Sequence, residues 1–118
     1  MAEVDRLLAE ARATVAPRAT VEDLASADLV VDIRPYELRN RDGPLPGAIV
    51  IDRNALEWRL DPTSPHRIPE ATGAELRVVL VCDEGYASSL AAAALRRLGL
   101  VHATDLDGGF QAWRASTS

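Results

Sequence analysis

Two periodicities alternate along the chain, and together they predict an α/β fold. Val78–Val81 is a short, continuous apolar run, and Leu29–Ile33 is a second one interrupted only by Asp32; such runs are typical of strands buried on both faces of a parallel sheet. Apolar residues at helical spacing predict an amphipathic helix over residues 2–15 and a second helix from Ser88 to Leu98. Buried strands that alternate with helices favour a sheet covered by helices.

Shorter elements fill the rest of the chain, and we expect all of it to form one domain. These elements are an edge strand at 18–20, a short helix opened by the Thr20–Asp23 capping box, a loop over 35–46, strands at 48–51 and 103–106, and a terminal helix from Phe110. A chain of 118 residues is too short for two cores. We therefore predict a single domain over residues 1–118, with a helix at 1–16 packed on it and a frayed tail at 114–118.

Composition and charge narrow the classes of function. The chain is 47% hydrophobic, which is sufficient for a core, and its formal net charge of −5 argues against nucleic acid or an anionic membrane as a partner. The single cysteine excludes an internal disulfide, and His66 and His102 lack the spacing of metal ligands. No apolar run reaches the ~18 residues of a membrane span. We expect a cytoplasmic protein that uses no metal or other cofactor.

The candidate chemistry lies where the central strand ends. Cys82 follows Val81 directly, and a loop with one glycine, Gly85, separates it from the next helix. Such a turn directs backbone N–H groups and the positive end of the helix dipole into one concavity, which stabilises a thiolate or another anion. A lone cysteine is more often a buried structural residue. Its position at the carboxyl end of a strand, which faces the ligand crevice of such sheets, favours a functional role.

Two charged residues end the other buried strand. Asp32 and Arg34 are expected at the same edge of the sheet as Cys82. We interpret Asp32 as one partner of a structural ion pair. For Arg34 two interpretations stay open: the guanidinium completes that ion pair, or it binds an anionic substrate beside the cysteine loop.

Several segments together resemble the rhodanese-homology domain, and the resemblance spans nearly the whole chain. The segments that carry it are, in order, Val30–Arg34, Pro46–Ile49, Leu80–Cys82 with Gly85 and Ser88, and Leu106–Trp113. Each segment alone is weak, but their order and distances are specific. The resemblance implies a three-layer α/β fold in which helices flank a parallel five-stranded sheet.

The resemblance also implies a sulfurtransferase that works through Cys82. A donor transfers its outer sulfur to Cys82, and an acceptor thiol or cyanide then removes that sulfur from the resulting persulfide. The substrate-binding loop that the family implies continues after the cysteine with Asp83, Glu84, Gly85, Tyr86, Ala87 and Ser88. Its N–H groups and the Ser88 hydroxyl would surround the persulfide, so no second residue is needed as a base.

Asp83 and Glu84 distinguish this loop from those of thiosulfate-using relatives, which tend to carry basic or neutral residues there. Two like charges 4 Å apart cost about 4 kcal/mol at an effective dielectric of 20, whereas an exposed helix N-terminus contributes roughly 0.3–1 kcal/mol. The two carboxylates therefore oppose the thiolate and repel a dianion. We expect weak activity with thiosulfate, and a neutral, cationic or protein-bound persulfide as the donor, with a thiol as acceptor.

One other class of function stays open, and a second is disfavoured. One is a non-catalytic or regulatory module that binds a protein partner; the acidic loop favours it, and the intact cysteine loop disfavours it. The other is a cysteine phosphatase of related architecture, which needs an arginine for the phosphoryl oxygens where this chain has Ser88. The sulfurtransferase is favoured over both.

Overall fold

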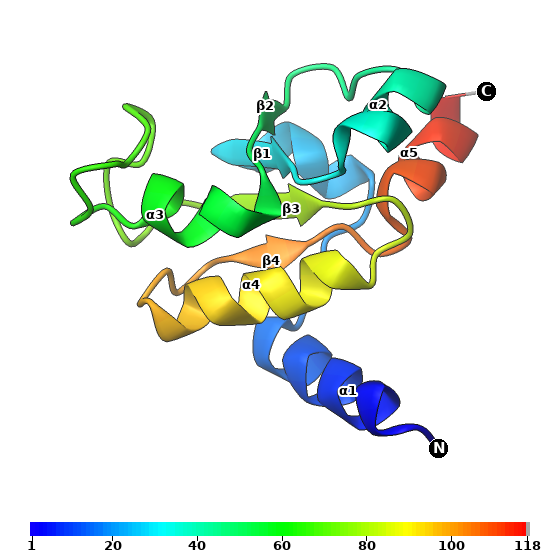
Figure 1. The fold of residues 1–118 in the computed structure, drawn as a ribbon, viewed down its shortest axis with the longest axis horizontal. Helices are drawn as coiled ribbons and strands as arrows, with labels where there is room; N and C mark the ends of the chain where they lie inside the picture. The colour runs from blue at the N-terminus through cyan, green and yellow to red at the C-terminus, as the bar shows by residue number, and fades with distance from the viewer. Residues whose placement is uncertain (118) are drawn as a thin grey trace.

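The two buried apolar runs form adjacent strands at the centre of a parallel sheet in the computed structural model, which describes residues 1–117 (Figure 1). They are β1 (Leu29–Asp32) and β3 (Val78–Val81). The pairing runs in register from Leu29 beside Val78 to Asp32 beside Val81. Because the strands are parallel, their carboxyl ends meet at the same edge of the sheet, which is where the candidate chemistry lies.

Two short strands complete the sheet. β2 (Ile49–Val50) pairs with β1, and β4 (Thr104–Asp105) pairs with β3, which gives the order β2-β1-β3-β4. The short 3₁₀ helix η2 (Arg53–Ala55) follows β2. The sheet therefore has four strands, one fewer than the resemblance implies.

A single β-bridge is formed at the place of the expected fifth strand. Ala19 forms a parallel bridge with Leu106 beside β4. Pro17 has no N–H with which to extend this pairing, and the N–H of Thr20 is bound to the Asp23 carboxylate at 2.8 Å. The predicted capping contact between Thr20 and Asp23 thus turns the chain away from the sheet after one residue.

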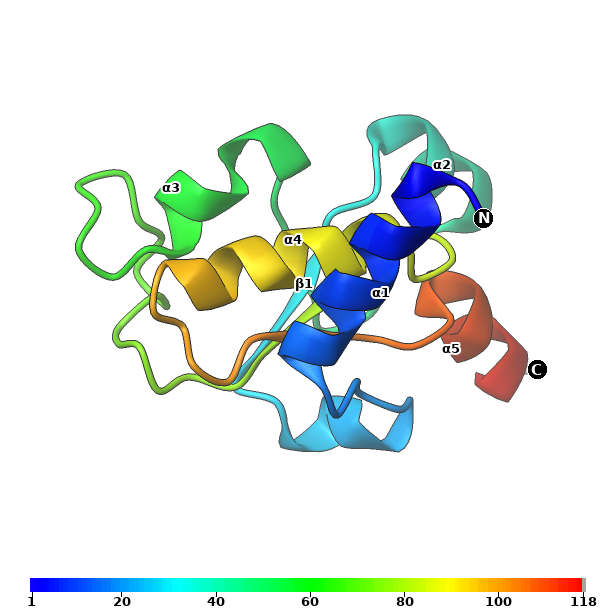
Figure 2. The same cartoon turned by 90° about the horizontal axis from the view of Figure 1, so that it is seen from below.

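Helices cover both faces of the sheet (Figures 1 and 2). α3 (Leu56–Leu60) and α4 (Ala87–Arg97) lie on one face, and the 3₁₀ helix η1 (Glu22–Ser26) and α5 (Gly109–Thr117) lie on the other. The N-terminal helix α1 (Glu3–Val15) packs mainly on α4, outside the layer that touches the sheet. In the described part of the chain, no helix has the length and apolar character that a membrane crossing requires.

Side-chain alternation along β3 divides the apolar interior into two clusters. Val78 and Leu80 belong to the cluster under α3 and α4, whereas Val79 and Val81 belong to the cluster under η1 and α5. All four side chains are buried, as the continuous apolar run predicts. Cys82 is the next residue in this alternation, and it joins the cluster on the α4 side.

Two segments are more regular than the sequence predicts. The expected loop over 35–46 contains a helix, α2 (Tyr36–Asp42), which begins directly after Pro35. The expected frayed tail continues α5 through Thr117, because the Arg114 guanidinium binds the Asp42 carboxylate at 3.0 Å and ties α5 to the end of α2. Ser118, also part of the expected tail, lies outside the described residues.

Candidate active site

The Cys82 sulfur lies among hydrogen-bonding groups of the loop between β3 and α4. The N–H groups of Gly85 and Ser88 point to Sγ at 3.2 and 3.4 Å. The thiol donates to the Ser88 hydroxyl at 3.2 Å. Cys82 is 7% exposed, so it is buried on its apolar side yet is not sealed among aliphatic groups. The cradle of N–H groups that the strand–loop–helix pattern predicted is present around this sulfur.

Gly85 has a conformation that its neighbours require. Its φ angle is +86°, and a Cβ at this position would lie 2.8 Å from the backbone nitrogen of Gly108. Its carbonyl accepts hydrogen bonds from the guanidinium groups of Arg12 and Arg18, both at 2.8 Å. The loop therefore needs a glycine here, because both the positive φ and the close approach exclude a side chain.

A buried carboxylate lies beneath the loop, at the end of β4. Asp105 is fully buried and accepts hydrogen bonds from the hydroxyl groups of Ser88 at 2.7 Å and Ser89 at 2.9 Å. A chain of hydrogen bonds thus runs from the Cys82 thiol through Ser88 to Asp105. The sequence pattern did not mark Asp105 as a site residue. The available signal was a carboxylate inside a short predicted strand.

Arg18 balances the charge of this carboxylate. Its guanidinium donates to both Asp105 oxygens at 3.0 Å. Burial by itself lowers the pKa of Arg18, but the hydrogen bond and charge of Asp105, with the charge of Asp107, outweigh burial and raise that pKa above its ordinary value. The guanidinium also interacts electrostatically with the Cys82 sulfur. No local sequence pattern marks Arg18 for this role.

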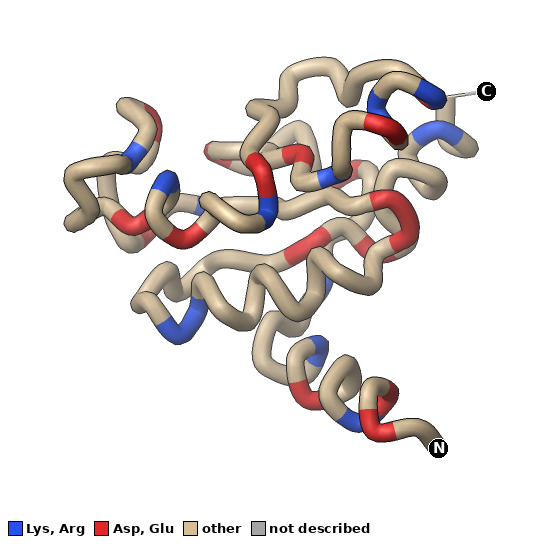
Figure 3. The backbone as a smooth tube through the Cα atoms, in the orientation of Figure 1, with Lys and Arg blue, Asp and Glu red and all other residues tan. Residues whose placement is uncertain are grey.

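The two acidic loop residues have different surroundings, although both lie in the acidic segment that joins β3 to α4 (Figure 3). Asp83 accepts a hydrogen bond from the Gln111 side chain at 2.8 Å, and its carboxylate lies 3.5 Å from the Arg41 guanidinium. Its side chain is 22% exposed. Glu84 is exposed. The charge of Asp83 is therefore partly balanced by Arg41, whereas that of Glu84 faces solvent.

The start of α5 binds the backbone of the same loop. The N–H of Phe110 donates to the Cys82 carbonyl at 2.8 Å, and the N–H of Gln111 donates to the Asp83 carbonyl at 3.1 Å. A Cβ on Gly109 would lie 2.6 Å from the Cys82 carbonyl oxygen. The glycine pair at 108–109, predicted as a tight turn, thus lets the helix end approach the active-site backbone.

Asp32 and Arg34 form the structural ion pair expected of Asp32. Arg34 donates to the two Asp32 oxygens at 3.0 and 2.7 Å and to the Gly43 carbonyl at 3.0 Å. Its guanidinium lies 3.7 Å from the centre of the Phe110 ring. Both residues are buried, and the pair joins β1 to the end of α2 and to α5. These contacts favour the structural interpretation that the sequence left open for Arg34.

The two remaining residues of the predicted substrate-binding loop, Tyr86 and Ala87, are exposed.

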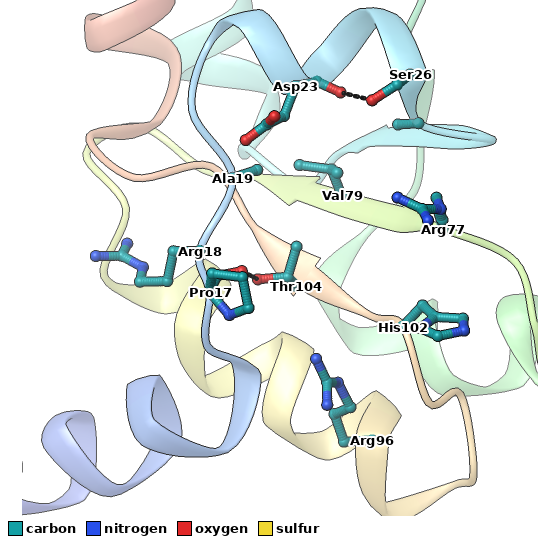
Figure 4. Close-up of a pocket in the computed structure, with 11 residues that line it drawn as sticks. Pro17, Arg18, Ala19, Asp23, Ser26, Arg77, Val79, Arg96, His102 and Thr104 are labelled. Atoms are coloured by element: carbon teal, nitrogen blue, oxygen red, sulfur yellow. Dashed lines mark hydrogen bonds between the residues drawn. The ribbon is translucent and has the colours of Figure 1, made fainter.

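A hollow of about 280 Å³ lies apart from the cysteine, and none of its lining residues belongs to the Cys82 loop. The side chain of Arg18, on its border, extends away from His102 (Figure 4). Within residues 1–117, no group of three or more His, Cys, Asp or Glu residues is placed to bind a metal ion.

Comparison with known proteins gives one matching family. A family model of the rhodanese-like domain matches residues 17–116. No curated protein matches the chain significantly.

Solved structures of the same fold include two that are similar in sequence. RPA3614 from Rhodopseudomonas palustris, a protein of unknown function described as a possible tyrosine phosphatase, is 30% identical, with a TM-score of 0.86 over 100% of this chain and 93% of that chain. The human single-domain sulfurtransferase TSTD1 is 25% identical, with a TM-score of 0.72 over 87% of this chain and 99% of that chain. The Alr3790 protein from Anabaena shares the fold at 23% identity and a TM-score of 0.66, over 83% of this chain and 77% of that chain.

Proposed function

This chain belongs to the family of rhodanese-like domains, and from that premise we propose that it is a sulfurtransferase that carries a sulfane sulfur on Cys82. The observation that carries the proposal is the pair of loop N–H groups, from Gly85 and Ser88, at 3.2 and 3.4 Å from Sγ. Donors in this arrangement stabilise negative charge on sulfur. The attacking thiolate and the outer sulfur of a persulfide both carry that charge.

The transfer takes place in two nucleophilic steps. The Cys82 thiolate attacks the outer sulfur of a donor persulfide, R–S–SH; a new S–S bond forms, the donor S–S bond breaks, and the donor leaves as the thiolate R–S⁻. An acceptor thiolate then attacks the outer sulfur of the Cys82 persulfide, and breakage of that bond restores the Cys82 thiolate. No net oxidation or reduction occurs, because each S–S bond that breaks is replaced by another.

Ser88 serves the sulfur in both of its charge states. Its hydroxyl accepts from the protonated thiol and donates to Asp105 in the observed arrangement. Rotation of the same hydroxyl directs its proton to an anionic sulfur, while Asp105 keeps its bonds to Arg18 and Ser89. The sulfur therefore needs no separate general base, since N–H groups, a hydroxyl and the start of α4 stabilise the anion.

The donor we favour is a neutral, cationic or protein-bound persulfide, and the acceptor is a thiol. Glu84 is exposed on the loop, and the arginines that contact the loop are bound to the Gly85 carbonyl or lie beside Asp83. The exposed carboxylate of Glu84 therefore repels a dianion such as thiosulfate at the loop. A single free thiol also suits a reducing compartment, and we place the protein in the cytoplasm.

Phosphatase activity is the second candidate, because RPA3614 is described as a possible tyrosine phosphatase. A cysteine phosphatase binds three phosphoryl oxygens with a guanidinium that closes the loop. Here Ser88 holds that position, and Arg12 and Arg18 bind the Gly85 carbonyl. A regulatory module without catalysis is the third candidate, and it predicts that the cradle takes up no sulfur.

Mass spectrometry, together with a phosphatase assay, separates the three candidate functions. We expect the purified protein to gain the mass of one sulfur atom after exposure to a small-molecule persulfide, and to lose it on addition of a thiol. Cys82→Ser should show neither change, and thiosulfate should load the wild-type protein less completely. Absence of the adduct with every donor would favour the regulatory module. Hydrolysis of p-nitrophenyl phosphate that depends on Cys82, without sulfur loading, would favour the phosphatase.

A further inference from the structure

One side chain of α1 reaches the Cys82 loop, although α1 lies outside residues 17–116 that the family model matches. The Arg12 guanidinium donates to the Gly85 carbonyl at 2.8 Å and to the Ser89 hydroxyl at 3.2 Å. It also lies 5.2 Å from the centre of the Tyr86 ring. One arginine of the N-terminal helix therefore contacts the loop backbone, a loop side chain and the first turn of α4.

Arg12 and Arg18 both bind the Gly85 carbonyl at 2.8 Å, and this shared contact restrains the backbone of the cysteine loop. The Gly85 carbonyl and the Tyr86 N–H belong to one peptide unit, and this unit is trans, so the two groups point in opposite directions. A guanidinium bound to that carbonyl holds the Tyr86 N–H away from the arginine side. It also fixes Gly85 itself, whose own N–H lies 3.2 Å from the Cys82 sulfur. Hydrogen bonds from charged donors are stronger than those from neutral donors, so a guanidinium restrains the orientation of the Gly85 carbonyl.

Arg12 differs from Arg18 in its charge balance. Arg18 forms salt bridges with Asp105 and Asp107, so its charge is matched by carboxylates. Arg12 forms no salt bridge with any carboxylate of the described residues; its hydrogen bonds go to a carbonyl and a hydroxyl. The positive charge of Arg12 thus lies beside the loop without a carboxylate to balance it.

We propose that Arg12 is a positioning residue for sulfur transfer: together with Arg18 it holds the Gly85 carbonyl and so restrains the loop whose N–H groups face the Cys82 sulfur, and its unbalanced charge favours the anionic sulfur. The inference rests on the proposed function, and it makes α1 a working part of the active site. Arg6 on the same helix offers a matched control. Its side chain is 59% exposed and binds Glu3 and Glu10.

The test compares Arg12→Gln and Arg6→Gln with the wild-type protein. The rate at which neutral iodoacetamide alkylates Cys82 is measured against pH, together with the rate of sulfur transfer from a small-molecule persulfide to a thiol. In Arg12→Gln we expect both rates at pH 7 to fall about tenfold, which corresponds to about 1.4 kcal/mol. The alkylation profile should move about one pH unit to the alkaline side and reach the same plateau at high pH. Arg6→Gln should stay within about twofold of wild type, since its exposed ion pairs contribute little.

Arg12→Lys keeps the charge but lacks the planar fork that spans Gly85 and Ser89. We expect its profile to lie between those of wild type and Arg12→Gln. Urea unfolding shows whether each variant is folded, and a folded Arg12→Gln with the wild-type profile would overturn the positioning role. If the wild-type protein takes up no sulfur but Arg12→Gln still moves the alkylation profile, the proposed function fails and the positioning role stands.

Discussion

Asp105 is fully buried and receives hydrogen bonds from three side chains, those of Arg18, Ser88 and Ser89. A carboxylate taken out of water is costly unless opposite charge and hydrogen bonds replace its hydration. Here both requirements are met, and two of the donors are serines at the start of the helix that follows the cysteine loop. At the scale of single residues, Asp105 therefore contributes both to the stability of the protein and to the hydrogen-bonded surroundings of Cys82.

The two carboxylate partners of Arg18 offer a test of this assignment. We expect Asp105→Asn to lower the free energy of unfolding by about 3 kcal/mol or more, because loss of this partner leaves the largely buried Arg18 guanidinium with only the exposed Asp107 to balance its charge. Asp107, the other partner, is 70% exposed. For Asp107→Asn we expect a loss below about 1 kcal/mol. Urea unfolding followed by circular dichroism measures both, and a loss for Asp105→Asn no larger than that for Asp107→Asn would contradict the assignment.

At the scale of elements, the end of α2 and the start of α5 meet beside the acidic part of the loop. Asp42, the last residue of α2, accepts hydrogen bonds from Arg41, from Gln111 at 3.0 Å and from Arg114 at 3.0 Å. Gln111 also donates to Asp83 in the loop. The cysteine loop is thus held from α1 on one side and from α2 and α5 on the other. α2, which forms inside the segment predicted as a loop, therefore contributes to holding the cysteine loop on the α5 side.

The contacts of Asp42 predict a loss of stability in acid. The hydrogen bond from Arg41, followed by that from Gln111 and the charges of Arg114 and Arg41, lowers the pKa of Asp42 far below 3.8, against the opposing effect of burial. Because this pKa is lower in the folded than in the unfolded protein, the ionised group stabilises the fold above about pH 4, and that contribution is lost as the pH falls below it. We expect Asp42→Asn to unfold at lower urea concentration than wild type at pH 7, and the difference to shrink at pH 3. A difference that is unchanged between the two pH values would contradict this.

At the scale of the whole molecule, charge controls which reagents reach the sulfur. The chain carries a formal net charge of −5, and the segment that bears Asp83 and Glu84 borders the site (Figure 3). Exposed charges act over a Debye length of about 10 Å at 0.1 M salt and about 3 Å at 1 M. The expected discrimination against dianions is therefore an effect of the electrostatic field around the site, and salt should weaken it.

A pair of alkylating reagents measures this electrostatic field without any assumption about the sulfur-transfer reaction. Iodoacetate is an anion and iodoacetamide is neutral, yet both alkylate the same thiolate. We expect the ratio of their rates at Cys82, iodoacetate over iodoacetamide, to rise several-fold between low salt and 1 M sodium chloride. Glu84→Gln should raise the ratio at low salt and flatten its dependence on salt. A ratio that does not respond to salt would mean that the acidic loop has no part in donor selection.

What the sequence determined by itself is local along the chain. The buried strands, α1, α4 and the position of Cys82 between β3 and α4 follow from periodicity and from neighbouring residues, because a strand end, a loop and a helix start are contiguous in sequence. The order of motifs was specific enough to indicate the family. The N–H groups around the sulfur were likewise predictable, since Cys82, Gly85 and Ser88 lie close together in the sequence.

Only the tertiary structure decided what surrounds that loop. Arg18 and Asp105 are 87 positions apart, and Arg12 and Gly85 are 73 positions apart, so no spacing rule connects them. The extended α5 also depends on a distant contact, that between Arg114 and Asp42. Charge pairing across such distances is a property of packing, because only the folded sheet brings these groups together, where burial and opposite charge favour one arrangement.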